Sequence, residues 1–288
     1  TELNCHQYHN LHPHDSAAHL MSLNFSASSC ENETFSACEL SNGEYIILDM
    51  GRQITGTPKI TLSGSPGDYI NVIYGEICLD GKLIPLHCTH GRRTDTVILS
   101  DKELEWSSHC PRSFRYIAIH AQEVQASCLI KNPGARILQS QQENRGSFEC
   151  NDETLNSIYQ ISMSTLNSCG QYNFVNSPAG DNCQYIADAT IQGLTSIISQ
   201  GSAQLSRKSL IEFALSQFET GEIPGATPST IYFNIPDYPL HWIKWLQKHL
   251  LFTNDKELLE VCLPALGKLL NYYNNHTDKE HYALNSQL

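Results

Sequence analysis

The chain has 288 residues, of which 40% are hydrophobic, and its 30 acidic and 18 basic residues give a net charge of -12. No run of basic residues is longer than Arg92-Arg93, which excludes nucleic acid as an expected partner. No apolar run approaches the roughly 20 residues that cross a bilayer, and the first residues lack a signal-peptide pattern, so no membrane partner is expected. The length predicts two domains.

Residues 1–40 show little pattern and are rich in Ser, Asn and His. Such a terminal stretch is typical of an arm or of a partial upstream module. From about residue 45 to residue 130, short runs of β-branched and aromatic residues alternate with Gly and Pro turns. This rhythm predicts an antiparallel β-sandwich over residues 41–140.

After Ser147 the spacing of apolar residues changes to that of helices. A first helix is expected to start after Asn151-Asp152 and to end at Gly170, and Asn254-Asp255 are expected to cap the last. Further helical stretches are predicted near 183–199, 203–218, 238–252 and 255–274. Because each helix must bury an apolar stripe against neighbours on both sides, five helices do not close a ring. Residues 141–288 therefore indicate an incomplete helical domain.

The cysteines and histidines indicate no metal centre. The 11 cysteines are scattered and form no C-x-x-C pair. Several lie in apolar runs, which favours reduced thiols in a cytoplasm, while a periplasmic or secreted location stays open. Neither histidine cluster has the paired spacing of a zinc module, so no metal is expected; the clusters are His6, His9, His12, His14 and His87, Cys88, His90.

The stretch NSPAGDNCQYIADATIQGL, residues 176–194, is the strongest candidate for chemistry. Asp181 and Asp188 are seven positions apart, which on a helix places them on one face about 10 Å apart. Glycoside hydrolysis needs a carboxylic acid to protonate the leaving oxygen and a carboxylate to activate water or attack carbon. The alternative is that Asp181 caps a helix and Asp188 is a solvated helical residue.

The same stretch resembles the barrel motif of the bacterial α-L-rhamnosidases of glycoside hydrolase family 78. The resemblance extends over about 44–284 and rests on four ordered blocks, 44–76, 145–159, 176–194 and 221–246. Within the motif, the positions that keep the family's residues are Pro178, Gln184, Tyr185, Ile186, Asp188, Ile191, Gln192 and Leu194. The resemblance implies a multidomain fold of β then α, in which the β-sandwich is followed by the first helices of an (α/α)6 barrel, 141–288.

The resemblance also implies roles for particular residues. The family's general acid, a Glu, falls on Asp181, and its sugar-holding acids fall on Asn176 and Asp188. Asp237 and Trp242 lie in a segment similar to its cavity wall, although ordinary helix packing is the alternative for Trp242. The family's general base falls in a later part of the barrel, beyond the last residue of this chain.

The expected function is inverting hydrolysis of terminal α-L-rhamnosides, with a rhamnose-containing oligosaccharide or glycoside as the partner and no cofactor. Two departures from the motif keep alternatives open. Asn176 replaces an Asp and loses its charge, and Asp181 is one methylene shorter than Glu. A catalytically inactive carbohydrate-binding homologue, or a fragment that lacks the general base, therefore remains an alternative, and self-association into a homo-oligomer also stays open.

Overall fold

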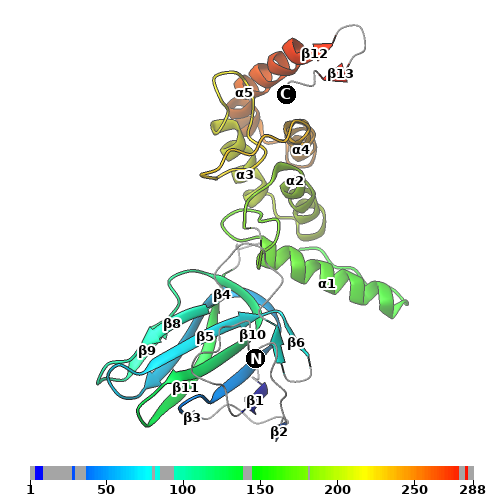
Figure 1. Cartoon of the computed structure of the whole chain (residues 1–288). Helices are drawn as coiled ribbons and strands as arrows, with labels where there is room; N and C mark the ends of the chain where they lie inside the picture. Colours follow the sequence, from blue (N-terminus) through cyan, green and yellow to red (C-terminus); the bar gives the residue numbers. More distant parts are fainter. Residues whose placement is uncertain are drawn as a thin grey trace. The chain divides into compact units, whose positions relative to one another are not determined.

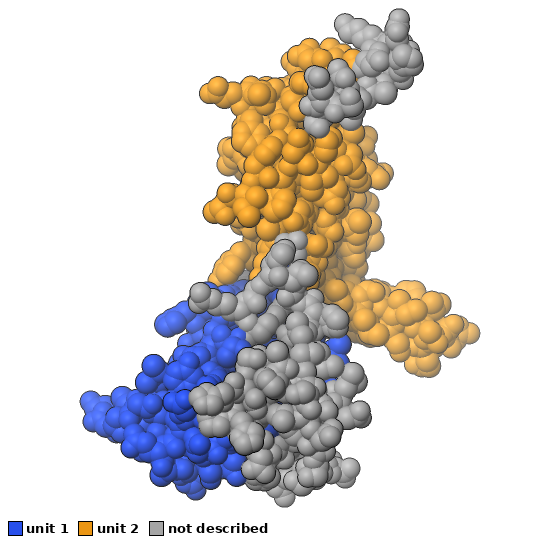
Figure 2. Space-filling model, viewed as in Figure 1, with its two compact units in different colours: residues 1–138, 178–180 blue, residues 139–177, 181–288 orange. Residues whose placement is uncertain are grey.

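The computed structural model describes residues 4–8, 28–29, 37–79, 82–84, 94–138, 145–180, 182–278 and 283–284. The chain divides into two units, one formed by residues 1–138 and 178–180 and the other by residues 139–177 and 181–288 (Figure 2). Antiparallel strands make up the first unit and helices dominate the second. The predicted order of a β part followed by an α part is therefore confirmed.

All strand pairs of the first unit are antiparallel within the described residues. The larger sheet contains β1 (Asn4–Tyr8), β2 (Ser28–Ser29), β3 (Ala37–Ser41), β4 (Tyr45–Ser63), β5 (Tyr69–Gly75), β8 (Thr94–Ile98), β9 (Leu104–Ser107), β10 (Arg112–Glu123) and β11 (Ser127–Ile137). A separate hairpin is formed by β6 (Ile77–Leu79) and β7 (Lys82–Ile84).

Strand β4 pairs with four other strands of the larger sheet (Figure 1). Its first part pairs with β1 and β10, and its last part pairs with β11 and β9. The change of partner occurs at Gly56, which pairs with Arg112 on one side and Ile137 on the other. A Cβ at Gly56 would lie 2.2 Å from the carbonyl oxygen of Arg136, so the close approach of β11 requires glycine there.

The core of the β unit follows from alternation along its strands. Ile46, Leu48 and Met50 of β4 join the main apolar cluster, whereas Tyr45 and Ile47 contribute to a second cluster on the opposite face of the strand. Burial on both faces explains why Tyr45–Met50 is an almost continuous apolar run rather than a strictly alternating one.

Within residues 1–40 the structure describes strands β1 and β2 and the start of β3. Strand β1 pairs along β4, with Tyr8 opposite Tyr45 and Asn4 opposite Asp49, and β2 pairs with β1. The sequence NCHQY carries no regular apolar alternation and β2 has two residues, so neither gives a strand signal. Their pairing depends on the backbone edge that β4 offers.

The helical unit contains α1 (Glu153–Cys169), α2 (Ile186–Thr195), α3 (Gln204–Leu215), α4 (Tyr238–Thr253) and α5 (Lys256–His276), with a π-helical turn at Ser196–Gln200 and a short β12 (Thr277–Asp278) and β13 (Ala283–Leu284) pair. The predicted caps are confirmed where the structure shows them. The Asp152 carboxylate accepts from the backbone N–H groups of Thr154 and Leu155, Gly170 ends α1, and Asp255 accepts from the N–H of Leu258.

Two tryptophans on α4 centre the core of this unit. Trp242 and Trp245 are fully buried, and the Trp245 ring lies 6.2 Å from that of Phe174 and 6.5 Å from that of Phe213, centroid to centroid. Helix α2 packs against α4 at this point. The packing is close because Gly193 faces the indole, where a Cβ would lie 2.7 Å from Cζ2 and Nε1 of Trp245.

We expect Gly193→Ala to lower the free energy of unfolding by about 1–3 kcal/mol, because overpacking a rigid buried ring displaces the helices. Gly267→Ala is the matched control, since a Cβ at this helical glycine of α5 meets nothing within 4 Å, and the better helix propensity of alanine should raise stability by about 0.5–1 kcal/mol. Urea titration of both variants measures the difference. Equal effects of the two substitutions would contradict the close packing of α2 on α4.

The indole of Trp245 also belongs to a buried hydrogen-bonded group. Nε1 of Trp245 donates to the hydroxyl of Ser206 at 2.8 Å, and that hydroxyl lies 2.9 Å from Nδ1 of His249. All three residues are buried. Burial lowers the pKa of His249 below its ordinary value, and nearby Arg207 lowers it while Asp255 opposes the shift. Because the Ser206 oxygen already accepts from the indole, its own proton is available for a neutral imidazole.

This arrangement predicts acid sensitivity of the helical unit. Above pH about 6.5 His249 is neutral in the folded and unfolded chains, and as the pH falls below 6.5 the unfolded chain takes up the proton first. Stability is therefore lost by at most about 1.4 kcal/mol per pH unit in that window. We expect His249→Gln to flatten the dependence of the thermal midpoint on pH between 7.5 and 5.5. An unchanged slope in the variant would show that His249 does not cause the sensitivity.

Candidate active site

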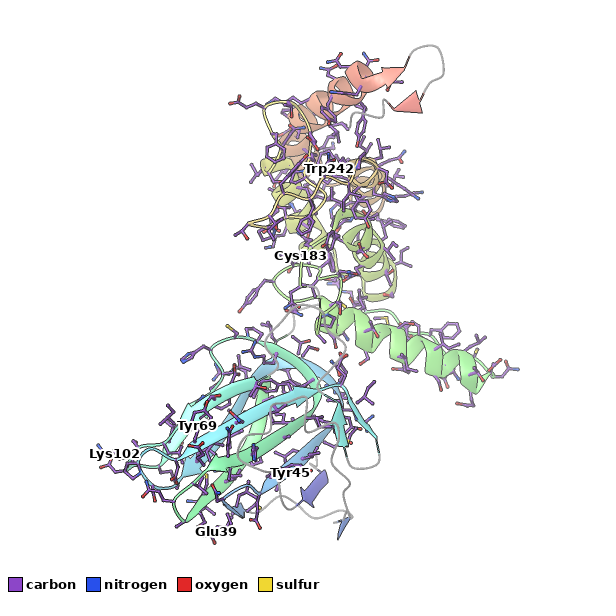
Figure 3. The ribbon with its side chains drawn as sticks, viewed as in Figure 1. Glu39, Tyr45, Tyr69, Lys102, Cys183 and Trp242 are labelled. Atoms are coloured by element: carbon purple, nitrogen blue, oxygen red, sulfur yellow. The ribbon has the colours of Figure 1, made fainter. Side chains whose placement is uncertain are left out.

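The loop before α2 carries two of the predicted site residues. The N–H of Asn176 donates to the carbonyl of Cys183 at 3.0 Å, so the two ends of the segment between them are joined. The side chain of Asn176 is exposed. Asp181, the predicted general acid, belongs to this segment but lies outside the described residues. Cys183, labelled in Figure 3, lies at the end of this segment, just before α2.

Gln184 fixes this loop to the rest of the helical unit. The residue is 1% exposed, and its side-chain oxygen accepts from the N–H of Phe174 at 3.2 Å and from the hydroxyl of Ser209 at 2.6 Å. Its amide nitrogen donates to the carbonyl of Thr227 at 2.9 Å and to the Glu212 carboxylate at 3.4 Å. Because both the oxygen and the nitrogen of this buried amide are hydrogen-bonded, Gln184 holds three separate segments together.

Backbone pairing brings two distant sequence blocks into contact next to Gln184. Tyr185 forms an antiparallel bridge with Ala226, and Ile186 donates to the carbonyl of Gly225 at 3.0 Å. Gly225 in turn donates to the carbonyl of Phe233 at 2.9 Å. Blocks 176–194 and 221–246 are therefore neighbours in space, and the start of α2 lies beside the segment that leads into α4.

Two carboxylates at the starts of these helices act electrostatically on Tyr238. Asp188 lies half-buried in the first turn of α2, and Asp237 is the exposed residue that precedes α4. The pKa of Tyr238 is raised, first by burial and then by the negative charges of Asp188 and Asp237. The predicted site residues Asp188 and Asp237 thus share one neighbourhood.

Several aromatic rings lie close together around Tyr185 and Tyr238. The Tyr185 ring lies 5.3 Å from that of Phe233 and 6.4 Å from that of Tyr238, and Tyr238 lies 6.3 Å from the imidazole of His241, centroid to centroid. Tyr238 and His241 are absent from the predicted site. Their signal in the sequence is the run DYPLH, in which Tyr238 follows an acid at a helix start and His241 follows one turn later.

Trp242 does not occupy the predicted position in a sugar-binding wall. Its side chain is 0% exposed, and Nε1 donates to the carbonyl of Leu210 at 3.1 Å. The residue lies among the helices of its unit, as Figure 3 shows. An indole closed in on all sides offers no ring face to a ligand, so its structural role is helix packing, the alternative that its spacing on α4 also allowed.

Acids, hydroxyls and an imidazole in this neighbourhood are suited to sugar recognition and proton transfer. Carboxylates accept bonds from sugar hydroxyls, and a phenol or imidazole either donates or accepts. Within the described ranges, no group of three or more His, Cys, Asp or Glu residues is arranged to hold a metal ion, and no helix is long and apolar enough to cross a membrane. The histidine clusters at residues 6–14 and 87–90 lie largely outside those ranges.

Comparison with known proteins assigns both units to one family. The model of the bacterial α-L-rhamnosidase concanavalin-like domain matches residues 39–133, and that of the bacterial α-L-rhamnosidase six-hairpin glycosidase domain matches residues 143–287. The chain belongs to the bacterial α-L-rhamnosidase family. The rhamnosidase fold predicted from the sequence is thereby confirmed, and the family consists of glycoside hydrolases. No curated protein sequence matches the chain.

Solved rhamnosidases share this fold at low sequence identity. The GH78 family rhamnosidase of Bacillus sp. GL1 is 21% identical with a TM-score of 0.74, and the match covers 82% of this chain and 24% of that one. The rhamnosidase from Klebsiella oxytoca with rhamnose bound is 18% identical with a TM-score of 0.74, covering 96% of this chain and 57% of that one. The Streptomyces avermitilis α-L-rhamnosidase complexed with L-rhamnose is 18% identical with a TM-score of 0.67, and the match covers 84% of this chain and 24% of that one. The rhamnosidase-family chain described here thus spans less than two thirds of each.

Proposed function

We propose that the intact protein hydrolyses terminal α-L-rhamnosidic bonds with inversion at the anomeric carbon. The observation that carries the proposal is that Asp188 and Asp237 lie at the starts of α2 and α4, two helices that pack together, within a chain of the rhamnosidase family. The bound rhamnose in the Klebsiella oxytoca and Streptomyces avermitilis structures supports L-rhamnose as the sugar that this neighbourhood holds.

In the proposed reaction Asp181 is the general acid. It gives its proton to the aglycone oxygen as the glycosidic C–O bond breaks, while a water molecule that loses its proton to a base attacks the anomeric carbon from the opposite face. Asp188 and Asn176 accept bonds from the sugar hydroxyls and orient the ring. The base is assigned to no residue of this chain.

A second candidate is sugar binding without turnover. Two residues favour it: Asn176 replaces the family's Asp and cannot stabilise a positive oxocarbenium-like centre by charge, and Asp181 reaches one methylene less far than the family's Glu. A protein of this kind holds L-rhamnose through the same hydroxyl contacts and releases no product.

One pair of measurements tests both candidates on the intact protein. With 4-nitrophenyl α-L-rhamnopyranoside, hydrolysis is expected to yield β-L-rhamnose as the first anomer in the NMR spectrum, and the 4-nitrophenyl α-L-fucopyranoside control is expected to stay intact. Release of α-L-rhamnose first would overturn inversion. Calorimetric binding of L-rhamnose with no release from the aryl glycoside supports the second candidate, and the absence of both binding and release overturns the two together.

A further inference from the structure

A cavity of about 490 Å³ lies between two edge strands of the β unit, β8 and β9. Among the described residues β8 pairs with β5 alone and β9 with β4 alone, and both strands lie on the same side of the unit in Figure 1. The lining of the cavity includes Asp95, Trp106, His109 and Arg112. We call it the edge cavity.

Asp95 and Trp106 enter the edge cavity from the inner sides of their strands. Val97, two positions after Asp95, is buried in the main apolar cluster, so Asp95 lies on the same face of β8. Trp106 lies opposite Ile60 and is partly buried against the same cluster. A carboxylate on the core side of a strand needs polar partners there.

Three neighbours supply those partners and hold Asp95 ionised. Its Oδ2 accepts from the hydroxyls of Tyr74 at 2.7 Å and Ser108 at 2.8 Å and from Nε of Arg112 at 3.4 Å, and its Oδ1 accepts from Nη2 of Arg112 at 2.5 Å. Burial opposes ionisation, but the hydrogen bonds from Arg112, Tyr74 and Ser108 outweigh it and lower the pKa of Asp95. The edge cavity thus contains a fixed ion pair without net charge.

This ion pair has hydrogen-bonding capacity to spare. A guanidinium has five N–H donors; two of those on Arg112 serve Asp95, and the other three have no partner in the described part of the chain. Oδ1 of Asp95 accepts one bond and has room for another. The pair of Arg115 with Asp49 differs, because there each carboxylate oxygen faces its own guanidinium N–H at 2.9 Å. Asp95 and Arg112 therefore place an open acceptor beside open donors.

The Trp106 indole adds an apolar ring and a further donor. Its Nε1 forms no hydrogen bond within the described ranges and is not among the buried polar atoms that lack a partner, so this N–H is accessible. The two tryptophans of the helical unit instead donate to neighbouring groups. His109, exposed on the loop after β9, adds an imidazole that either donates or accepts.

The charge balance of the edge cavity favours a neutral ligand. Arg112 is the only Lys or Arg among the described lining residues, and Asp95 neutralises it, so an anion gains no net attraction. Hydroxyl groups do gain, because hydrogen bonds to ionised partners are stronger than those between neutral groups. Adjacent hydroxyls on one sugar ring match an acceptor beside a donor, and the C–H face of the ring matches an indole.

We propose that the edge cavity binds a neutral sugar residue through two adjacent hydroxyl groups. One hydroxyl donates to Oδ1 of Asp95, the next accepts from Arg112, and the C–H face of the ring contacts Trp106. A second sugar site on a glycoside hydrolase raises the local concentration of a saccharide substrate. The site uses no residue assigned to hydrolysis, so its test is separate from turnover.

NMR titration of the full chain tests the proposal with the methyl glycosides of α-L-rhamnose, α-D-mannose, β-D-galactose and β-D-glucose as probes. At least one is expected to bind, with the same affinity at low and high salt. Its fully O-methylated derivative donates no hydrogen bond and is expected to bind at least about ten-fold more weakly. Binding of none of these glycosides, or equal binding of the O-methylated derivative, overturns the proposal. Tighter binding of the uronate analogue of the same sugar overturns the neutral class.

Variants assign the binding to the edge cavity. Arg112→Lys keeps the charge but removes the planar fork of donors and should weaken binding about ten-fold or more. Arg115→Lys is the matched control, since it makes the same change in an ion pair of the same unit outside the lining, and it should alter affinity less than about two-fold. Equal affinities of the two lysine variants overturn the assignment.

A second variant decides the assignment if Arg112→Lys does not fold. Trp106→Leu keeps an apolar side chain against the core but removes the ring and its N–H, and it should weaken binding about five-fold or more. Wild-type affinity in Trp106→Leu overturns the site. If Asp188→Asn abolishes all sugar binding while Trp106→Leu leaves it unchanged, the sugar binds only in the helical unit, and this inference fails while the proposed hydrolysis stands.

Discussion

Asp181→Asn in the intact protein is expected to lower kcat/KM about 10²–10⁴-fold on rhamnosides with poor leaving groups, because a general acid contributes a factor of that size. The loss should shrink on aryl rhamnosides as the pKa of the leaving phenol falls, since a stable phenolate departs without a proton. A series of aryl rhamnosides that spans leaving-group pKa measures the effect, and the variant should show a steeper dependence of log(kcat/KM) on that pKa than the wild-type protein.

Two further variants separate acid catalysis from sugar binding. Asp181→Glu restores the longer arm of the family motif and should keep most of the activity, because a carboxylic acid is still available. Asp188→Asn should lower kcat/KM with the same slope on the leaving-group series as the wild type, because a residue that holds hydroxyls gives no proton to the aglycone. An Asp181→Asn variant with wild-type turnover across the whole series removes Asp181 from the role of acid.

Periodicity in the sequence predicts the two-part fold because local spacing determines which faces of strands and helices are buried. The change to helical spacing after Ser147 and the caps at Asp152 and Asp255 each depend on a few neighbouring residues. The strands at Asn4–Tyr8 and Ser28–Ser29 escape prediction for the opposite reason. Their residues carry no pattern, and only the distant edge of β4 makes them strands.

The candidate site also combines residues that a local sequence pattern predicts with residues whose position depends on tertiary contacts. Asp188 and Asp237 are predicted from motif positions, and in the structure the charges of both raise the pKa of Tyr238. The position of Tyr238 next to Tyr185 follows only from tertiary packing, which no local pattern reports. For Trp242 the motif position was misleading. A tryptophan that lines a cavity and one that packs in a helical core can have the same spacing along a helix. The hydrogen bond from the Trp242 indole to the carbonyl of Leu210 shows that this ring belongs to the core.

Gln184→Leu is expected to lower the free energy of unfolding of the helical unit by about 3–5 kcal/mol. Leucine has nearly the same size but no polar atoms, so the N–H of Phe174, the hydroxyl of Ser209 and the carbonyl of Thr227 lose the partner that Gln184 provides. Each buried group left without a partner costs about 1–3 kcal/mol, and the costs overlap within one network. Urea unfolding followed by tryptophan fluorescence measures the loss.

The measurement is made in a chain that also carries Trp106→Phe, so that the tryptophan fluorescence reports on the helical unit alone. The chain has 3 tryptophans, and the two that remain, Trp242 and Trp245, both lie in the helical core. Gln247→Leu on the exposed face of α4 is the matched control and should change stability by less than about 0.5 kcal/mol. In the intact protein Gln184→Leu should also lower turnover, since the amide ties the loop that begins at Asn176 to the segment leading into Asp237. Equal stability of the two leucine variants would mean that the three partners find other hydrogen bonds, and that the loop is held by backbone pairing at Tyr185 alone.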